Sequence, residues 1–333
     1  MYFFSIIICV YNPVQKSFNR LLTSILQFEK DNPSHEVIIV DNNSFPFLVE
    51  LDYVQSFLQI KNNSKIIREE KEGLTAARIA GIKESNSNWI LFFDDDNEPY
   101  RDYLKNAEDI ILEYSEIGAF GPGIVNVQFP SKKYENKFQK INYIFQNRQE
   151  NKPMFSNDKW WKDWYPAGTG LLVNHGIAQR YSQHVLNGDY SLSDRQGKML
   201  TSGGDLQIVL TAIKMGFKAG VHPSLKLNHI ITAEKLNLKY LKNLSFGTAA
   251  SNVPGHLQVW ESNEFGYFCP PDPSQILRQI YFHLKVKYKQ EGLLRMQLSM
   301  CSYLGSLKAL YDLNPSIRPS VWWLYSCRIL QVK

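Results

Sequence analysis

The sequence lacks the features that mark several protein classes. It holds only 4 cysteines among 333 residues, and Cys9, Cys269, Cys301 and Cys327 form no CxxC pair. We therefore expect reduced thiols in a cytosolic protein, and neither a disulfide framework nor a zinc site. No apolar run reaches the ~20 residues that a membrane-spanning helix needs. The apolar N-terminus stops at an Asn-Pro pair and has no basic segment before it, so we expect a buried first strand there.

Charge of either sign is also moderate, and its distribution is uneven. Charged residues make up 21% of the chain, which is against general disorder, and the hydrophobic content of 44% supports a sizeable core. The segment from Ser274 to Lys333 has nine Lys/Arg and two Asp/Glu, so it carries +7, and the remainder carries 5 − 7 = −2. This distribution argues against a nucleic-acid surface spread over the fold. It is compatible with contact between the basic C-terminus and an anionic membrane.

The first half of the chain alternates between apolar, β-rich runs and segments with helical spacing. The runs predict strands at 3–10, 36–41, 65–68, 89–94 and 117–124, the last with a Gly-Pro-Gly exit. One helix is predicted to begin after Ser17, which would cap it, and two more are predicted over 74–82 and 103–114. This order predicts an α/β fold with a mostly parallel central sheet flanked by helices.

The second half is less regular. We expect an irregular, aromatic segment over 126–165, and an aromatic cluster, a Gly-rich turn and a strand within 159–174. A helix within 202–217 should end at Gly216, and a strand and an amphipathic helix are predicted over 225–241. Helical spacing returns after Pro270-Pro271, which predicts a helical C-terminal extension.

Polar residues follow three of the predicted strands. Tyr11 and Asn12 follow the first, Asp41 the second, and the triplet Asp94 to Asp96 the fourth. In parallel sheets ligands bind outside the carboxyl ends of the strands, so we expect these groups on one edge. Adjacent carboxylates suit a hard divalent cation such as Mn²⁺ or Mg²⁺, although Asp is also common in solvated turns. At the end of a buried strand, the triplet favours the metal.

Two further side chains have alternatives that stay open at this point. Asp41 suits an acceptor for a uracil N–H or a ribose hydroxyl, or else an Asx-turn or cap. Arg78 stands on a helix otherwise made of small residues, where it suits a base or a diphosphate. Alternatively it pairs with Glu72 or Glu84.

Seven short motifs in order resemble the family 2 glycosyltransferases of the GT-A fold. They are "IIICVYNP", "VIIVDNNS", "KEGLTAARIAGI", "WILFFDDDNEP", "PAGTGLLV", "GGDLQI" and "LNHII", and they span roughly residues 3 to 245. The resemblance implies a nucleotide-diphospho-sugar donor, with UDP-sugar expected, a divalent metal, and an inverting mechanism with a carboxylate base. It also implies a bacterial surface glycan, such as O-antigen or capsule, as the setting.

The resemblance assigns roles to individual residues of this chain. The nucleoside, base and diphosphate would contact Tyr11, Asn12, Asp41, Gly73 and Arg78, with Asp94 and Asp95 near the ribose and metal. Asp96 would be the principal metal ligand, with Asp94 beside it and His229 at the metal or diphosphate; His222 is the competing histidine. A lone histidine is otherwise more often structural.

Asp205 is the candidate general base, because "GGDLQI" keeps the aspartate of the family's acidic motif while Gly204 replaces the usual glutamate. Without the resemblance, an N-cap of the following helix is the simpler interpretation. A second departure is Arg78-Ile79, where the family commonly has Arg-Asn. Either departure bears on substrate preference.

Acceptor binding is expected at Trp164, Gly168 and Gly204, since aromatic faces stack on pyranose rings. Core packing of Trp160, Trp161 and Trp164 is the alternative. The basic tail with Trp322, Trp323 and Tyr325 suits peripheral membrane contact, or a helical cap with a solvated basic face.

We expect a catalytic domain over 1–250, with a nucleotide-sugar half over about 1–125 and an acceptor half over about 126–250, and a basic helical extension over 251–333. The predicted function is transfer of a sugar to a hydroxyl of a glycan or lipid-linked glycan. No nucleic-acid partner is expected. A nucleotidyltransferase and a non-catalytic carbohydrate-binding or assembly protein are the alternatives.

Overall fold

The structure is a computed structural model that describes residues 1–28, 33–192, 194, 200–260 and 270–313. Cys269, Cys327 and the aromatic residues predicted for membrane contact, Trp322, Trp323 and Tyr325, lie outside this part of the chain. Two compact units divide the chain. The first is Met1–Asp189 with Asp205–Thr232, and the second is Tyr190–Gly204 with Ala233–Lys333. The functional division near residue 250 stays a prediction.

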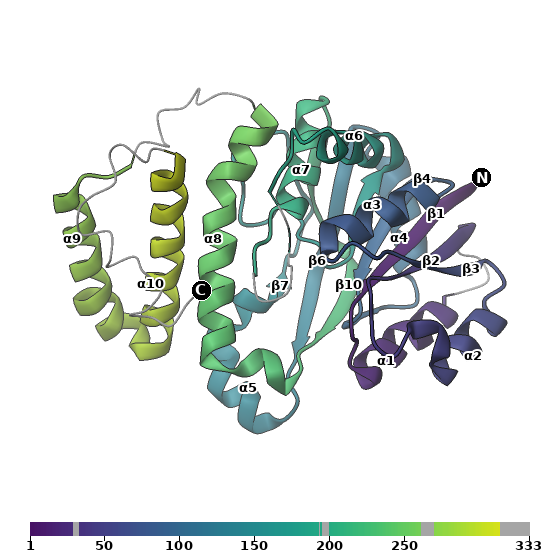
Figure 1. Cartoon of the computed structure of the whole chain (residues 1–333), viewed down its shortest axis with the longest axis horizontal. Coiled ribbons are helices and arrows are strands. Elements are labelled where there is room, and N and C mark those ends of the chain that lie inside the picture. The colour runs from purple at the N-terminus through teal and green to yellow at the C-terminus, as the bar shows by residue number, and fades with distance from the viewer. Residues whose placement is uncertain (29–32, 193, 195–199, 261–269, 314–333) are drawn as a thin grey trace. The chain divides into compact units, whose positions relative to one another are not determined.

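The first unit is built on one mixed sheet with the order β3-β2-β1-β4-β9-β6-β10-β5. Figure 1 labels most of these strands. Its strands are β1 Tyr2–Val10, β2 His35–Asp41, β3 Ser64–Arg68, β4 Ser87–Asp94, β5 Asn97–Pro99, β6 Ile117–Gln128, β7 Arg148–Gln149, β8 Met154–Ser156, β9 Leu171–Asn174 and β10 Lys218–Ile230. Strands β3, β2, β1 and β4 are parallel, as are β6 and β10. The short β9 is inserted antiparallel between β4 and β6. The predicted α/β class is confirmed.

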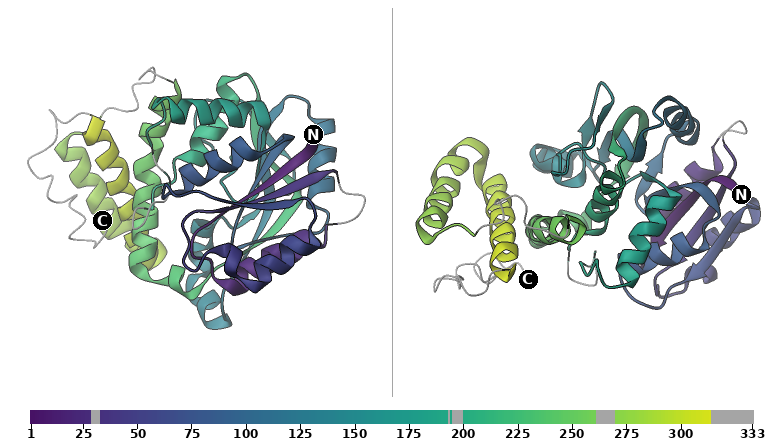
Figure 2. Two further views of the ribbon diagram at one scale, coloured as in Figure 1. Left: turned by 45° about the vertical axis from the view of Figure 1, so that its right-hand side comes forward. Right: turned by 90° about the horizontal axis from the view of Figure 1, so that it is seen from above.

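Helices cover both faces of this sheet (Figures 1 and 2). The helices between β1 and β10 are α1 Gln15–Leu26, α2 Asp52–Ile60, α3 Leu74–Glu84, α4 Tyr103–Glu113, α5 Lys132–Phe138, α6 His175–Leu186 and α7 Gly204–Lys214, with 3₁₀ segments η1 Leu48–Glu50 and η2 Gln139–Phe145. Alternate β1 residues such as Ile6 and Ile8 share one buried cluster with α1, α2 and α4. Ile7 points to the opposite face, where a Cβ on Gly81 of α3 would stand 2.5 Å from it. The absence of a side chain at Gly81 lets α3 pack directly on β1.

Three predicted boundaries are wrong. Helix α1 begins at Gln15, and Ser17 lies inside it, donating its hydroxyl to the carbonyl of Val14. Strand β6 does not exit at Gly-Pro-Gly but continues to Gln128. Pairing with β10 continues past Pro122 through a register shift. The segment predicted as irregular contains α5, η2, β7 and β8.

The second unit is helical in its described part. It contains η3 Ala233–Leu236, α8 Leu238–Trp260, α9 Pro273–Phe282, the π-helical segment η4 His283–Lys287, and α10 Tyr288–Leu313. Gly292 has φ 81°, a left-handed value that breaks α10 and reverses the chain direction there. Ile276, Met300, Leu304 and neighbouring residues form its core. None of the helices in the described ranges is both long and apolar enough to cross a membrane.

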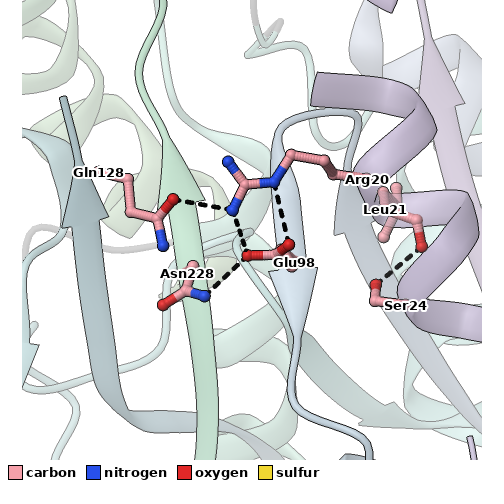
Figure 3. Close-up of polar contacts among 6 residues, drawn as sticks. All are labelled: Arg20, Leu21, Ser24, Glu98, Gln128 and Asn228. Carbon is pink, nitrogen blue, oxygen red and sulfur yellow. Dashed lines mark hydrogen bonds and ion pairs between the residues drawn. The ribbon is translucent and has the colours of Figure 1, made fainter. Parts of the chain in front are cut away.

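A polar network fixes the short edge strand β5 (Figure 3). Glu98 of β5 accepts hydrogen bonds from Arg20 Nε at 3.0 Å and Nη2 at 2.5 Å, and from Asn228 Nδ2 at 2.8 Å. The same Nη2 donates to Gln128 Oε1 at 2.8 Å. Helix α1 and strands β5, β6 and β10 are thereby tied together. Since β5 begins directly after the aspartate triplet, this network also fixes the position of Asp96.

Glu98 makes the stability of the first unit depend on pH. Burial opposes ionisation, but hydrogen bonds from Arg20 and Asn228 and the charge of Arg20 outweigh it, so the pKa of Glu98 lies below its ordinary value of 4.5. A lowered folded-state pKa contributes stability above 4.5 that is lost as pH falls through the folded-state value. We expect Glu98→Gln to unfold at a lower temperature than wild type near neutral pH, with the difference shrinking in acid. A difference in melting temperature between wild type and variant that is the same at every pH would contradict this.

Candidate active site

The polar residues at the strand ends meet on one edge of the sheet. In the β1 register Val10 pairs with Asp41 of β2 and Cys9 with Asp94 of β4. The two aspartates therefore flank the carboxyl end of β1, from which Tyr11 and Asn12 continue. This is the location at which parallel sheets bind ligands.

Asp41 organises the loop after β2. Its Oδ1 accepts the Ser44 N–H and its Oδ2 the Leu48 N–H, both at 2.9 Å, so it forms the turn and cap that were the alternative to ligand binding. Asn12 has φ 47°, and its Oδ1 accepts the Phe45 N–H. Each Asp41 oxygen has a second lone pair, and a ligand contact through it stays a prediction.

A neighbouring asparagine holds the entrance to α3. Asn42 accepts the Gly73 N–H at 2.8 Å and donates to the carbonyls of Glu69 and Lys71. Gly73, at φ 121°, precedes the first turn of α3. Tyr11 is exposed at 57%, so its ring is accessible beside this loop edge.

Arg78 and Asp205 form a buried ion pair. Arg78 of α3 is 2% exposed, and its Nη2 lies 2.5 Å from Asp205 Oδ1 of α7. Neither Glu72 nor Glu84, the partners weighed from the sequence, is this anion, and Glu84 pairs with Lys65. The guanidinium also lies 5.4 Å from the Phe92 ring. Arg78 thus orients the carboxylate of the candidate base.

Asp205 keeps part of its side chain accessible. Its Oδ1 is buried against the Arg78 guanidinium, while the side chain as a whole is 13% exposed. A partly exposed carboxylate can take the proton of a hydroxyl that approaches from its open side.

The Gly-rich turn, residues 167–170, connects the candidate base to the triplet. A Cβ on Gly168 would stand 2.6 Å from Arg78 Nη2 and 2.8 Å from Asp205 Oδ1. Thr169 donates its hydroxyl to Asp94 Oδ2 at 3.2 Å. Gly170, at φ 70°, offers its carbonyl to the Tyr103 hydroxyl. The turn therefore lies in contact with Asp205 on one side and Asp94 on the other.

The three aspartates of the triplet have different surroundings. Asp94 is half-buried and contacts Thr169. Asp95 is half-buried, and together with burial its negative charge raises the pKa of Tyr53 in α2. Asp96 is only 3% exposed, and its Oδ1 lies 3.3 Å from His229 Nε2. The β5–β10 pairing sets this distance, because His229 is opposite Asn97.

The Asp96–His229 pair fits a divalent cation. His229 Nδ1 lies 2.8 Å from the Phe145 carbonyl, which only accepts, so this nitrogen carries a proton. In the neutral ring, Nε2 then directs a lone pair toward the carboxylate, as in metal-binding histidines. Two ligand atoms that each lie about 2.1 Å from one cation, at right angles to each other, are about 3 Å apart. The separation between Asp96 Oδ1 and His229 Nε2, 3.3 Å, is close to this value.

No cluster of three His, Cys, Asp or Glu side chains with metal-ligand spacing occurs within the described ranges. Asp96 and His229 would therefore be two protein ligands, as for cations that keep positions for phosphate oxygens and water. His222 is elsewhere. It stacks on Phe155, contacts Tyr114, and its Nδ1 accepts the Ser224 N–H; burial lowers its pKa.

The predicted acceptor residues have less defined surroundings. Trp164 and Trp161 are half-buried, and both rings pack edge-on against the buried Tyr165. Arg148 of β7 donates to the carbonyls of Asp163, Trp164 and Tyr165 and so fixes this segment. In the second unit, the buried Asp194 accepts the N–H groups of Gly203 and Gly204.

Thr169, Asp194 and the Arg20–Glu98 network were not predicted. Each depends on contacts between distant segments, and no local pattern distinguishes these residues from other polar ones. For Glu98, the only signal in the sequence was its position directly after Asn97, within the motif "WILFFDDDNEP".

The family described as "Glycosyl transferase family 2" matches residues 5–170. A dolichyl N-acetyl-alpha-D-glucosaminyl phosphate 3-beta-D-2,3-diacetamido-2,3-dideoxy-beta-D-glucuronosyltransferase of Methanococcus voltae is 25% identical over 255 residues, covering 75% of this chain and 73% of the relative. Glycosyltransferase AglE of Haloferax volcanii is 30% identical over 110 residues, 33% of this chain and 35% of the relative.

Two solved structures are weakly similar. TarS of S. aureus (residues 1–349) has a TM-score of 0.43 at 13% identity, covering 95% of this chain and 91% of that one. GalNAc-T7, solved with UDP, GalNAc and Mn²⁺, has a TM-score of 0.48 at 14% identity. The match covers 98% of this chain and 58% of that one. The family match and the curated relatives decide between a glycosyltransferase and the two alternatives. The chain belongs to glycosyl transferase family 2 and is a glycosyltransferase with the α/β, GT-A architecture expected of that family.

Proposed function

We propose that this enzyme is inverting and moves a sugar from a UDP-sugar to a hydroxyl of a glycan or lipid-linked glycan, with Asp205 as general base. The observation that carries the proposal is the contact of Gly168 with the Arg78–Asp205 pair, next to Thr169 on Asp94. The candidate base Asp205 and the aspartate triplet thus both lie next to the Gly-rich turn at residues 167–170. The name of the Methanococcus voltae relative, which specifies a dolichyl-linked acceptor, supports a lipid-linked glycan.

Asp205 would take the proton of the acceptor hydroxyl as that oxygen attacks the anomeric carbon. Arg78 would hold the carboxylate in orientation. Arg78 would also make the expected diphosphate contact, since a guanidinium suits oxyanions. Gly168 carries no side chain, which permits the close contact of its turn with this pair. Gly168, Trp164 and Gly204 are the acceptor contacts of the proposal.

On the donor side, Tyr11, Asn12, Asp41 and Gly73 would contact the nucleoside, with Asp94 and Asp95 at the ribose. Asp96 and His229 would hold a divalent cation, Mn²⁺ or Mg²⁺, with Asp94 as a further ligand. When bound, that cation neutralises negative charge on the departing diphosphate. The proposed setting is the synthesis of a bacterial surface glycan, with the enzyme peripheral at the cytoplasmic face of the membrane.

The donor class can be tested by thermal shift and product release. UDP-sugars should raise the melting temperature only with Mn²⁺ or Mg²⁺ present, because a ligand that binds the native state stabilises it by mass action. A UDP-release assay with simple sugar acceptors then tests transfer. An equal shift with GDP- or CMP-sugars would contradict the UDP assignment, and the absence of nucleotide release with every donor would contradict the proposed reaction.

Asp205→Asn tests the base. The amide keeps the shape of the side chain but takes no proton, so transfer should fall about 100-fold or more. UDP-sugar binding, measured by the same thermal shift, should remain nearly unchanged. Asp109→Asn, on an exposed face of α4, is the matched control and should retain activity. Transfer by Asp205→Asn at the wild-type rate would exclude the role.

His229→Ala tests the cation site independently of catalysis. Loss of one of the proposed protein ligands should weaken Mn²⁺ binding, measured by titration calorimetry with UDP present, by about tenfold or more. His222→Ala is the control, because His222 lies in the Phe155–Tyr114 cluster, and it should bind Mn²⁺ as wild type does. Equal affinities in the two variants would refute ligation by His229.

A further inference from the structure

The helix formed by α9, η4 and the first residues of α10, residues 273–291, is apolar on two opposite faces. Its inner face carries Ile276 and Ile280, which pack in the core of the second unit, and the buried His283. Its outer face carries Leu277, Tyr281, Leu284 and Tyr288, each between 51% and 60% exposed. Their spacing of four, three and four residues aligns them along one side of a helix.

This outer stripe, Leu277, Tyr281, Leu284 and Tyr288, is not expected of a surface with no partner. Single exposed apolar residues are common, but a continuous row of large ones marks an interaction site. Each residue of the stripe is more than half exposed, whereas a small soluble ligand is bound in a concave site that buries it.

The charges beside the stripe indicate the partner. Between residues 273 and 291 the basic residues are Arg278, Lys285, Lys287 and Lys289, and the only acidic one is Glu291. Lys285 Nζ lies 5.0 Å from the centre of the Tyr281 ring and donates a hydrogen bond to its hydroxyl. Lys285 therefore lies at the polar tip of the stripe, whereas Lys287 donates to the hydroxyl of Ser299 in α10.

This arrangement matches the physics of an interfacial helix. Leucine and the rings of tyrosine enter the region between headgroups and acyl chains, while phenol hydroxyls and lysine ammonium groups stay at headgroup level. Basic side chains at that level are attracted to anionic lipid headgroups. Two copies of the chain stacked through this face would instead bring both sets of cations together, which opposes self-association.

From this geometry we infer that the outer stripe of helix 273–291 docks the enzyme on an anionic membrane surface. The inference deepens the proposed function, because a lipid-linked acceptor would be presented at that surface. Membrane binding itself requires neither the donor nor the cation.

Co-sedimentation of the full chain with vesicles tests the inference. Vesicles of phosphatidylcholine mixed with phosphatidylglycerol should bind the protein, and binding should weaken with added salt. Vesicles of phosphatidylcholine alone should bind it weakly. Equal binding to both kinds of vesicle, or binding to neither, would overturn the inference.

Variants assign the surface. The double variant Leu277→Ser and Leu284→Ser should lower the vesicle partition coefficient at least about tenfold, since two leucines no longer enter the apolar layer. The double variant Lys285→Glu and Lys289→Glu should lose the preference for phosphatidylglycerol. The matched control is Leu112→Ser with Leu186→Ser, two exposed leucines of the first unit, and it should bind as wild type does.

Two further measurements separate the possible failures. All variants should release UDP with a water-soluble acceptor at the wild-type rate, which shows that they are folded; vesicle binding by a wild type that releases no UDP would refute the proposed function alone. Sedimentation velocity without lipid should give one species for wild type and for the leucine variant. A wild-type dimer that dissociates in that variant would assign the stripe to a second copy and overturn the inference.

Discussion

A buried guanidinium is costly unless a nearby group compensates its charge, and for Arg78 that group is the carboxylate of Asp205. The two residues are 127 positions apart, one on α3 and one on α7, so the pair is formed only when both helices are in place. Removing one partner of such a pair costs about 3–5 kcal/mol because the other charge is left uncompensated. The close approach of residue 168 to this pair also explains why that residue is a glycine.

A second, more exposed pair supports the other side of the site. Arg20 and Glu98 hold β5 against α1 and β10, and β5 determines how Asp96 faces His229. The two ion pairs act at different depths. The Arg78–Asp205 pair is nearly inaccessible to solvent, whereas Arg20 and Glu98 are about one-third and one-quarter exposed and are more sensitive to salt and pH. The cation-binding and proton-accepting parts of the proposed mechanism are thus stabilised separately.

Sequence reasoning succeeded where the pattern was local. Buried strands such as 3–10 and 89–94 and the edge with Asp41 and Asp94 followed from apolar runs and from the rule that parallel strands end together. It failed where tertiary contacts override local preference. Ser17 is a good cap residue, yet α1 starts before it, and the Gly-Pro-Gly of β6 looks like a strand end but is held in the sheet by β10. The ion partner of Arg78 could not be predicted, because nearby glutamates were the only candidates visible in the sequence.

The antiparallel strand β9 has a consequence for how the chain is made. It starts at Leu171, one residue after the family match ends, and it fills the gap between β4 and β6. A nascent chain that has left the ribosome only up to the Gly-rich turn therefore has unpaired edges on β4 and β6. The other edge of β6 stays unpaired until β10 has been synthesised. Pairings between such distant segments close slowly. A fragment that ends at residue 170 would lack β9 and β10 and would leave these edges open to pairing with other chains.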